Sequence, residues 1–148
     1  MTARKLGWYS NSEITTKTVA TGETVYVGRI VILSTADTVL VAATAAVNWY
    51  GACVDVIYRG KYTTFPDGSL IVPTTASAGD AVSIALNGRV CLQYDGTVAV
   101  GEQVETYTGG LVHTVTPTSA TVLGTVVGVV ESVEDATNKY AVVLLARS

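Results

Sequence analysis

The stretch AGDAVSIALNGRVCLQY, residues 78–94, says most about the architecture of this chain. On both sides of Asn87-Gly88, apolar residues alternate with small or polar ones, and this period of two is typical of a β-strand with one apolar face. Asn-Gly is also the dipeptide that most favours a two-residue hairpin turn. The stretch therefore predicts two paired strands joined at Asn87-Gly88, with a turn at Gly79-Asp80 leading into the first.

The turn at the start of this stretch recurs twice elsewhere in the chain. In every copy a glycine and an acid precede a strand that carries valine. The copies are Gly22-Glu23, Gly79-Asp80 and Gly101-Glu102. A second glycine and another strand-like phrase follow each copy. These second glycines are Gly28, Gly88 and Gly110. The unit predicts turn, strand, glycine reversal and strand, which is a hairpin pattern. We expect the repeated acids to hydrogen-bond turn amides, in preference to binding metal or serving as paired catalytic carboxylates.

Composition favours an all-β protein. Val, Thr and Ile supply more than a third of the 148 residues, and branching at Cβ favours the extended backbone. The sequence predicts a small β-barrel or β-tulip-like domain built from hairpins, with little or no helix. Residues 42–48 are the one place where a helical turn is expected. Because 49% of residues are hydrophobic and only 14% are charged, we also expect apolar surface that meets a partner.

The chain divides into an extended N-terminal arm, residues 1–17, and a single β domain, residues 18–148. The arm is polar but carries Trp8 and Tyr9, which either pack on the domain or a neighbouring subunit, or belong to a frayed terminus. Near the other end, residues 122–133 and 140–146 are apolar on both faces. They predict strands covered on two sides, separated by an acidic surface hairpin.

Several classes of partner are not expected. The net charge of −3 is scattered along the chain and forms no phosphate-binding stripe, so nucleic acid is not expected. No apolar run approaches the ~18 residues of a membrane-spanning helix, so no membrane is expected either. The first residues lack the apolar centre of a signal peptide, which predicts synthesis in the cytoplasm without one.

No arrangement of residues predicts catalysis. His113 is the only histidine, and the chain has no Cys-x-x-Cys, Gly-x-Ser-x-Gly or phosphate-cradling Gly-Lys-Ser/Thr motif. Cys53 and Cys91 lie in apolar stretches and are interpreted as core residues, while a disulfide between them requires that their strands be neighbours. Arg29 and Arg89 each follow a glycine, and solvated turn flanks are favoured over carboxylate-binding residues. We expect no enzyme, no cofactor and no metal.

A resemblance to one family rests on five short phrases. They are the repeated Ala-x-Gly-Asp/Glu-x-Val turns, Leu86-Asn87-Gly88-Arg89-Val90, Tyr50-Gly51-Ala52-Cys53-Val54, Leu123-Gly124 with Val127-Gly128-Val129-Val130, and Tyr140-Ala141-Val142-Val143-Leu144-Leu145. Together, over about residues 18–146, they resemble the small capsid cement, or decoration, proteins of tailed bacteriophages. The resemblance implies a homotrimer on the outside of the virion head that binds the major capsid protein at junctions between capsomers and stabilises the shell. Residues 59–73 have no counterpart in the pattern.

Aromatic residues are the candidates for the capsid or subunit interface. They are Trp8, Tyr9, Trp49, Tyr50, Tyr58, Tyr62 and Phe65. Packing inside the core or between subunits is the alternative for the group at 49–65, because aromatic side chains dominate such burial. Other functions stay open: a trimeric tail or fibre module, a carbohydrate-binding β domain that uses the same aromatics, and, least favoured, an enzyme that depends on His113.

Overall fold

The computed structural model describes residues 4–57, 63–64, 70–71, 74–115 and 125–146. Nearly all of its elements are strands, which confirms the predicted all-β class. The strands are β1 (Tyr9–Ser10), β2 (Ile14–Val19), β3 (Thr24–Tyr26), β4 (Ile30–Leu33), β5 (Thr38–Val41), β6 (Trp49–Ile57), β7 (Thr63–Thr64), β8 (Leu70–Ile71), β9 (Thr75–Ser77), β10 (Ala81–Ala85), β11 (Arg89–Gln93), β12 (Gln103–Thr106), β13 (Val112–Thr114), β14 (Val126–Asp135) and β15 (Tyr140–Leu145). Within the described ranges the only helix is one 3-10 turn, η1 (Thr108–Gly110).

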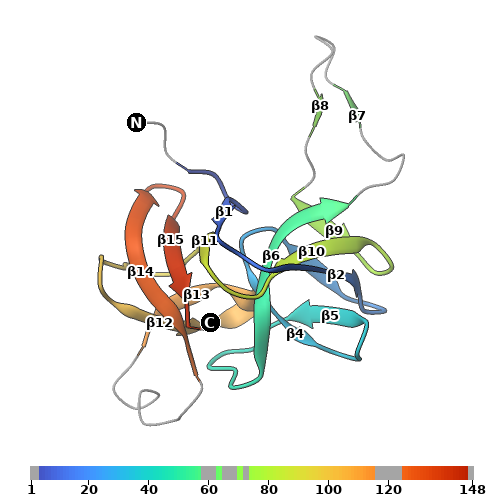
Figure 1. The fold of residues 1–148 in the computed structure, drawn as a ribbon, viewed down its shortest axis with the longest axis horizontal. Coiled ribbons are helices and arrows are strands. Elements are labelled where there is room, and N and C mark those ends of the chain that lie inside the picture. Colours follow the sequence, from blue (N-terminus) through green and yellow to red (C-terminus); the bar gives the residue numbers. More distant parts are fainter. Residues whose placement is uncertain (1–3, 58–62, 65–69, 72–73, 116–124, 147–148) are drawn as a thin grey trace.

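The strands form a barrel beside an open sheet (Figure 1). Strands β10, β2, β5, β4 and β6 close on themselves, in that order, as a small barrel. The open sheet has six antiparallel strands in the order β1-β11-β15-β14-β12-β13. The short pair β3 and β9 packs on the barrel, since Val25 and Ala76 belong to the barrel's apolar cluster. A barrel was expected, whereas the second, open sheet was not.

The predicted hairpin at Asn87-Gly88 is wrong, although both of its strands exist. β10 pairs with β2 and β6 in the barrel, and β11 pairs with β1 and β15 in the open sheet. Gly88 has a φ of 81°, and a Cβ there would lie 2.5 Å from the backbone oxygen of Asn11. Asn87 accepts a hydrogen bond from the Glu13 amide through Oδ1. Contacts with Asn11 and Glu13 therefore hold Asn87-Gly88 as the connection from the barrel to the open sheet.

The repeated glycine–acid turns are confirmed as turns. In all three copies the acid's amide donates to the carbonyl three residues back, and each glycine has a φ between 79° and 91°. These bonds are Glu23 N to Ala20 O, Asp80 N to Ser77 O and Glu102 N to Ala99 O. The side chains of Asp80 and Glu102 also accept from the amides of Ser77 and Ala99, at 2.9 and 2.6 Å, which confirms their structural role. Only the third unit continues as the predicted hairpin, β12 with β13.

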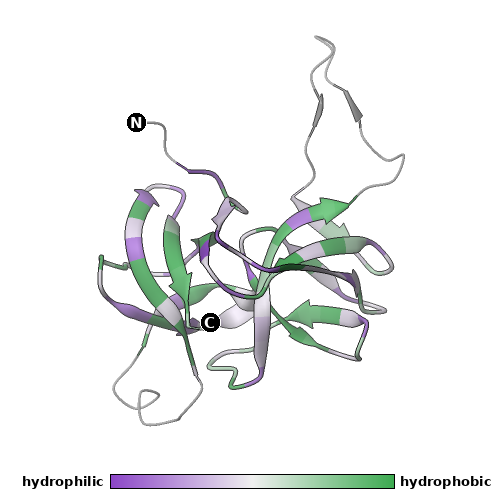
Figure 2. Cartoon of the chain, in the orientation of Figure 1, coloured by the Kyte–Doolittle hydropathy of each residue, from purple (hydrophilic) through white to green (hydrophobic). Residues whose placement is uncertain are grey.

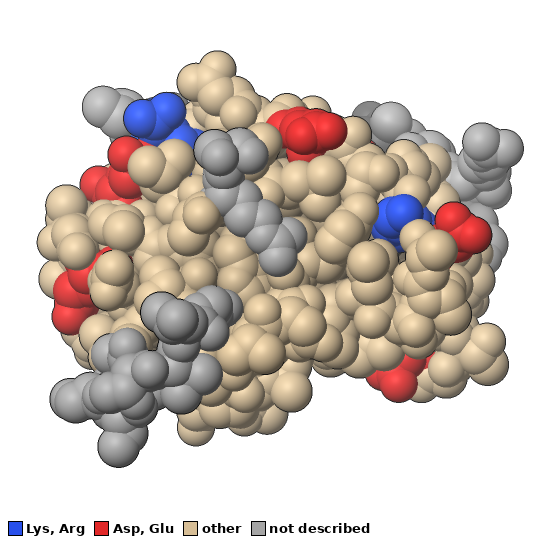
Figure 3. Space-filling model, turned by 60° about the horizontal axis from the view of Figure 1, so that its bottom comes forward, with Lys and Arg blue, Asp and Glu red and all other residues tan. Residues whose placement is uncertain are grey.

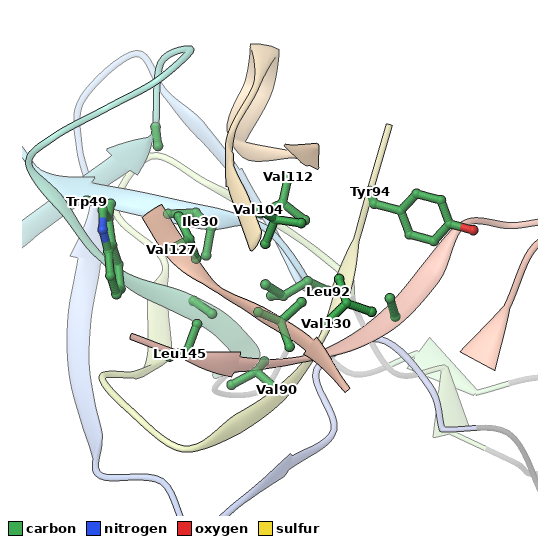
Figure 4. Packing of buried hydrophobic residues seen from close by; sticks show 14 of the residues in the cluster. Ile30, Trp49, Val90, Leu92, Tyr94, Val104, Val112, Val127, Val130 and Leu145 are labelled. Carbon is green, nitrogen blue, oxygen red and sulfur yellow. The ribbon is translucent and has the colours of Figure 1, made fainter. Parts of the chain in front are cut away.

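Two apolar clusters share the barrel wall. One fills the barrel and includes Val31, Cys53 and Ile84. The other lies between barrel and sheet, where Ile30 and Trp49 meet Leu92 and residues of β12, β14 and β15 (Figure 4). Apolar residues accordingly follow the strands of both layers (Figure 2). Ile30 of β4 and Ala52 and Val54 of β6 belong to the cluster between the layers, while Val31, Cys53 and Val56 belong to the barrel cluster. Most of the shared wall is therefore buried on both faces.

The expected helical turn at residues 42–48 is a loop instead. Ala45 has a positive φ of 50°, which an α-helix does not allow. The loop's backbone is satisfied from outside, by Thr106 at the end of β12. The Thr106 hydroxyl donates to Ala43 O at 2.6 Å and accepts from Ala46 N at 2.8 Å, and Thr106 O accepts from Ala45 N. These tertiary hydrogen bonds outweigh the helix propensity of alanine.

The predicted C-terminal hairpin is present, as the antiparallel pair β14 and β15. Its inner face is buried, but Leu144 on the outer face is 40% exposed. The expected arm boundary at residue 17 falls inside β2, because residues 14–17 pair with β10 in the barrel. Before β2, Tyr9 and Ser10 pair with β11 of the open sheet, whereas Leu6 packs against the barrel cluster.

Replacing Gly88 with Ala should destabilise the protein more than replacing Gly22. Both glycines have positive φ, but a Cβ at Gly22 meets nothing within 4 Å. We expect G22A to cost about 1 kcal/mol of unfolding free energy from its backbone alone. G88A should cost about 3 kcal/mol, since it also overpacks against Ser10 and Asn11. Urea unfolding of the two variants measures the difference, and equal costs would contradict the connection described here.

Thr106→Val should destabilise the protein by about 2 kcal/mol, because the change keeps the side chain's shape but leaves the buried Ala46 amide without its acceptor. Thr114→Val is the matched control, since the Thr114 hydroxyl makes a single exposed hydrogen bond to Thr97 O. We expect that control to stay within about 0.5 kcal/mol of the parent. Thermal unfolding of both variants checks the role of Thr106, and a T106V loss no larger than that of T114V would refute it.

Candidate interaction surface

The N-terminal segment, residues 4–10, packs on its own chain, and we call it the strap. Its Gly7 amide donates to Cys91 O at 3.2 Å, and its Trp8 carbonyl accepts from Cys91 N at 2.8 Å. Arg4 makes a 2.7 Å ion pair with Glu134 and lies 4.4 Å from the centre of the Trp8 ring. Leu6 packs against the barrel cluster. Of the alternatives open for Trp8, the structure shows the residue held on its own chain, through its backbone bond to Cys91 and the Arg4 guanidinium at its ring.

The candidate aromatic residues have different surroundings. Tyr9 is 47% exposed at the sheet edge, whereas Trp49 is 4% exposed and belongs to the core between the layers. Trp49 is therefore not available to a partner, because its side chain is packed in the core between the layers. Tyr50 is half-buried, with the Lys17 ammonium 5.8 Å from its ring centre. Tyr58, Tyr62 and Phe65 lie outside the described residues.

The outer face of the six-stranded sheet carries a cross-strand row with two apolar side chains at its centre, which the sequence did not single out. Arg89, Leu144, Val129 and Gln103 are register partners across β11, β15, β14 and β12, so their side chains share one face. Leu144 is 40% exposed and Val129 is partly exposed. The 2.5 Å ion pair between Arg89 and Glu131 lies beside them. Partly exposed apolar side chains beside polar ones are suited to contact with another protein.

Charge is sparse on the molecular surface. In the face shown in Figure 3, basic and acidic side chains are few, and much of the described surface between them carries neither. Large apolar side chains are also exposed in loops, including Val100 at 67% and Val47 at 56%.

Arg29 and Arg89 are more than solvated turn flanks. The Arg29 guanidinium lies 4.3 Å from the centre of the Tyr26 ring and donates to Gly109 O at 3.3 Å and Gln93 Oε1 at 3.4 Å. It therefore joins the β3–β4 connection to the open sheet. Arg89 binds a carboxylate, as the less favoured alternative held, but that carboxylate is Glu131 of its own sheet. Spacing in the sequence does not reveal either partner.

His113 lies against a buried acid that the sequence did not identify. Glu105 is 2% exposed, and its Oε1 lies 3.2 Å from His113 Nε2. The His113 ring also packs on Tyr107, with ring centroids 4.6 Å apart. Glu105 and His113 are register partners on β12 and β13, so their side-chain contact joins the two strands of that hairpin. Among the described residues, no group of His, Cys, Asp and Glu is arranged to hold a metal ion.

Both cysteines are buried free thiols, which confirms their interpretation as core residues. Burial raises the pKa of Cys53 to about 12. Burial, followed by the nearby Glu134 carboxylate, raises the pKa of Cys91 to about 12 as well. Cys53 lies inside the barrel, while the Cys91 thiol lies under the strap, 3.7 Å from Arg4 O.

A cavity of about 470 Å³ lies between the strap and β15 and is lined by Lys5, Leu6, Thr74 and Tyr140.

No helix in the described part of the chain is long and apolar enough to cross a membrane.

The sequence matches no family profile and no curated protein. Two solved structures share the fold. The head fibre gp8.5 N base of bacteriophage phi29 aligns over 92% of this chain and 97% of its own, with a TM-score of 0.55 and 16% identity. The pre-mature gene product 12 of bacteriophage phi29 aligns over 93% of this chain, with a TM-score of 0.50 and 14% identity. This chain spans only 21% of that second protein.

The reaction rates of the Cys53 and Cys91 thiols test whether these side chains are buried as described. With a pKa of about 12, either cysteine has a thiolate fraction of only about 10⁻⁴ at pH 8. We expect an aromatic disulfide reagent to react with the native protein at least about 100-fold more slowly than with the urea-unfolded protein, in which both thiols are free. One rapidly reacting thiol per native chain would contradict the structure.

Proposed function

We propose that this chain is a structural protein of a tailed-bacteriophage particle, which decorates the outer surface of the assembled head and stabilises the shell between capsomers. The observation that supports this most is the fold. Almost the whole chain matches almost the whole of the phi29 head fibre N base. The short sequence phrases that resemble cement proteins point to the same class of particle, and they do so independently of the fold.

The physical character of the molecule suits this role. A protein that binds the assembled shell and not its separated subunits stabilises the shell by the free energy of that binding. A wall buried on both faces makes the module stiff, and exposed Leu144 and Val129 provide apolar contact area. As a homotrimer, three such modules would bind one junction together, so weak individual contacts would give firm attachment.

The base of a fibre on the head is the second candidate function, and the likeness in fold to the phi29 head fibre base favours it. Both candidates put the chain on the outside of the head, against the major capsid protein. They differ in what the chain holds in place. A cement protein joins neighbouring capsomers at their junction, whereas a fibre base attaches a further fibrous part to the shell.

The purified protein should sediment with assembled heads that lack it, and not with unassembled major capsid protein. The heads come from the particle whose genome encodes this chain, and bound protein is quantified by gel densitometry. Binding to isolated tails instead of heads would favour a tail module. Binding to neither would refute the virion assignment.

Leu144→Lys should weaken head binding by about 10-fold or more, which corresponds to about 1.4 kcal/mol for an apolar contact replaced by a charge. Leu33→Lys is the matched control, because Leu33 is also 40% exposed but lies at the end of β4 in the barrel. Weaker binding by L33K alone would move the contact to the barrel and overturn the assignment of the outer sheet face.

A further inference from the structure

The strap occupies a strand-accepting edge of the open sheet. β1, the paired part of the strap, is the edge strand beside β11, while the next strand in the chain, β2, belongs to the barrel. Tyr9 and Ser10 are register partners of Val90 and Arg89, and Gly7 and Trp8 continue the pairing through hydrogen bonds to Cys91. Backbone groups on this edge of β11 are therefore hydrogen-bonded by the strap, a segment that continues directly into the barrel strand β2.

The side chains of the strap complete a self-contained set of contacts. Arg4 pairs with Glu134 of β14 at 2.7 Å, and Leu6 lies against Gly28, where a Cβ would come within 2.5 Å of Leu6 Cδ2. Gly7 fits only as glycine, since a Cβ there would lie 2.4 Å from Val54 O. The accepting site thus selects the sequence of the strap and not merely any extended chain.

The link between strap and barrel is short and turned. Residues 11–13 join β1 to β2, and Asn11 has a φ of 55°. Asparagine tolerates this left-handed conformation better than most residues, but an extended link would not need it. A straightened link would carry the strap away from its own chain without breaking a pairing of β2.

We propose that the strap is exchanged between copies of this protein, so that the edge of β11 in one copy accepts residues 4–10 of a second copy. An identical segment makes identical contacts, so exchange preserves the hydrogen bonds, the ion pair and the packing of Leu6. The free energy of exchange then depends mainly on the link and on protein concentration, as in other domain-swapped dimers. This inference concerns contacts between copies and does not depend on the proposed function.

Charge reversal at the ion pair tests the exchange in full-length chains. Arg4→Glu and Glu134→Arg each place like charges between the strap and its own sheet. In an exchanged pair that contains one chain of each variant, both contacts join opposite charges again, because the R4E strap then faces the E134R sheet and the unchanged Arg4 faces the unchanged Glu134. The two variants are refolded separately and as an equimolar mixture. Native mass spectrometry then measures mixed assemblies, and peptide mapping measures the labelling rate of Cys91 under the strap.

We expect Cys91 in each separate variant to be labelled at least about threefold faster than in the parent, as the loss of one ion pair implies. In the mixture, mixed assemblies should form, and Cys91 of both chains in a mixed assembly should return to near the parent labelling rate. The double variant R4E/E134R is the control, because it restores the contact within one chain and should match the parent when refolded alone. Labelling in the mixture at the average of the separate variants, or no mixed assemblies, would overturn the exchange. Circular dichroism and the labelling rate of Cys53 inside the barrel verify that each variant is folded.

Discussion

The wall that the barrel shares with the open sheet is the constraint on which the rest of the structure depends. Along β6, Trp49, Ala52 and Val54 face the core between the layers, while Cys53 and Val56 face the barrel interior. β4 divides its residues in the same way, with Ile30 on one side and Val31 on the other. Because both faces of this wall are buried, neither layer can be removed without exposing the other's core. Barrel and sheet therefore form one packed unit, although their strands belong to different sheets.

Features that depend on local chemistry could be predicted from the sequence. The all-β class follows from residues branched at Cβ, and the glycine–acid turns follow from a positive φ next to an acid that binds its own turn amide. The hairpin of β14 and β15 was also predictable, because two apolar strands flank a short acidic turn. Cys53 and Cys91 are buried as their apolar neighbours indicated.

Features that depend on distant residues could not be predicted in this way. Asn87-Gly88 has the signature of a hairpin, but the pairing of β10 and β11 is decided by the strap and by Leu145, whose amide donates to Gly88 O. The alanine-rich loop lacks a helix because Thr106, 60 residues away from Ala46, supplies its hydrogen bonds. The same limit applies to the candidate surface. Trp49 stood out as an aromatic residue but is core, whereas Leu144 became visible only when the register of β15 placed it on an outer face.

The proposed role of the molecule is adhesion, and it rests on a stiff apolar module whose fold resembles a phage head fibre base. Cryo-electron microscopy of virus particles from the source whose genome carries this sequence tests that proposed role most directly. The account predicts density on the outer surface of the head into which the barrel and its six-stranded sheet fit together, in contact with the major capsid protein. A head surface fully explained by other proteins, from a particle in which mass spectrometry finds no trace of this chain, would contradict it.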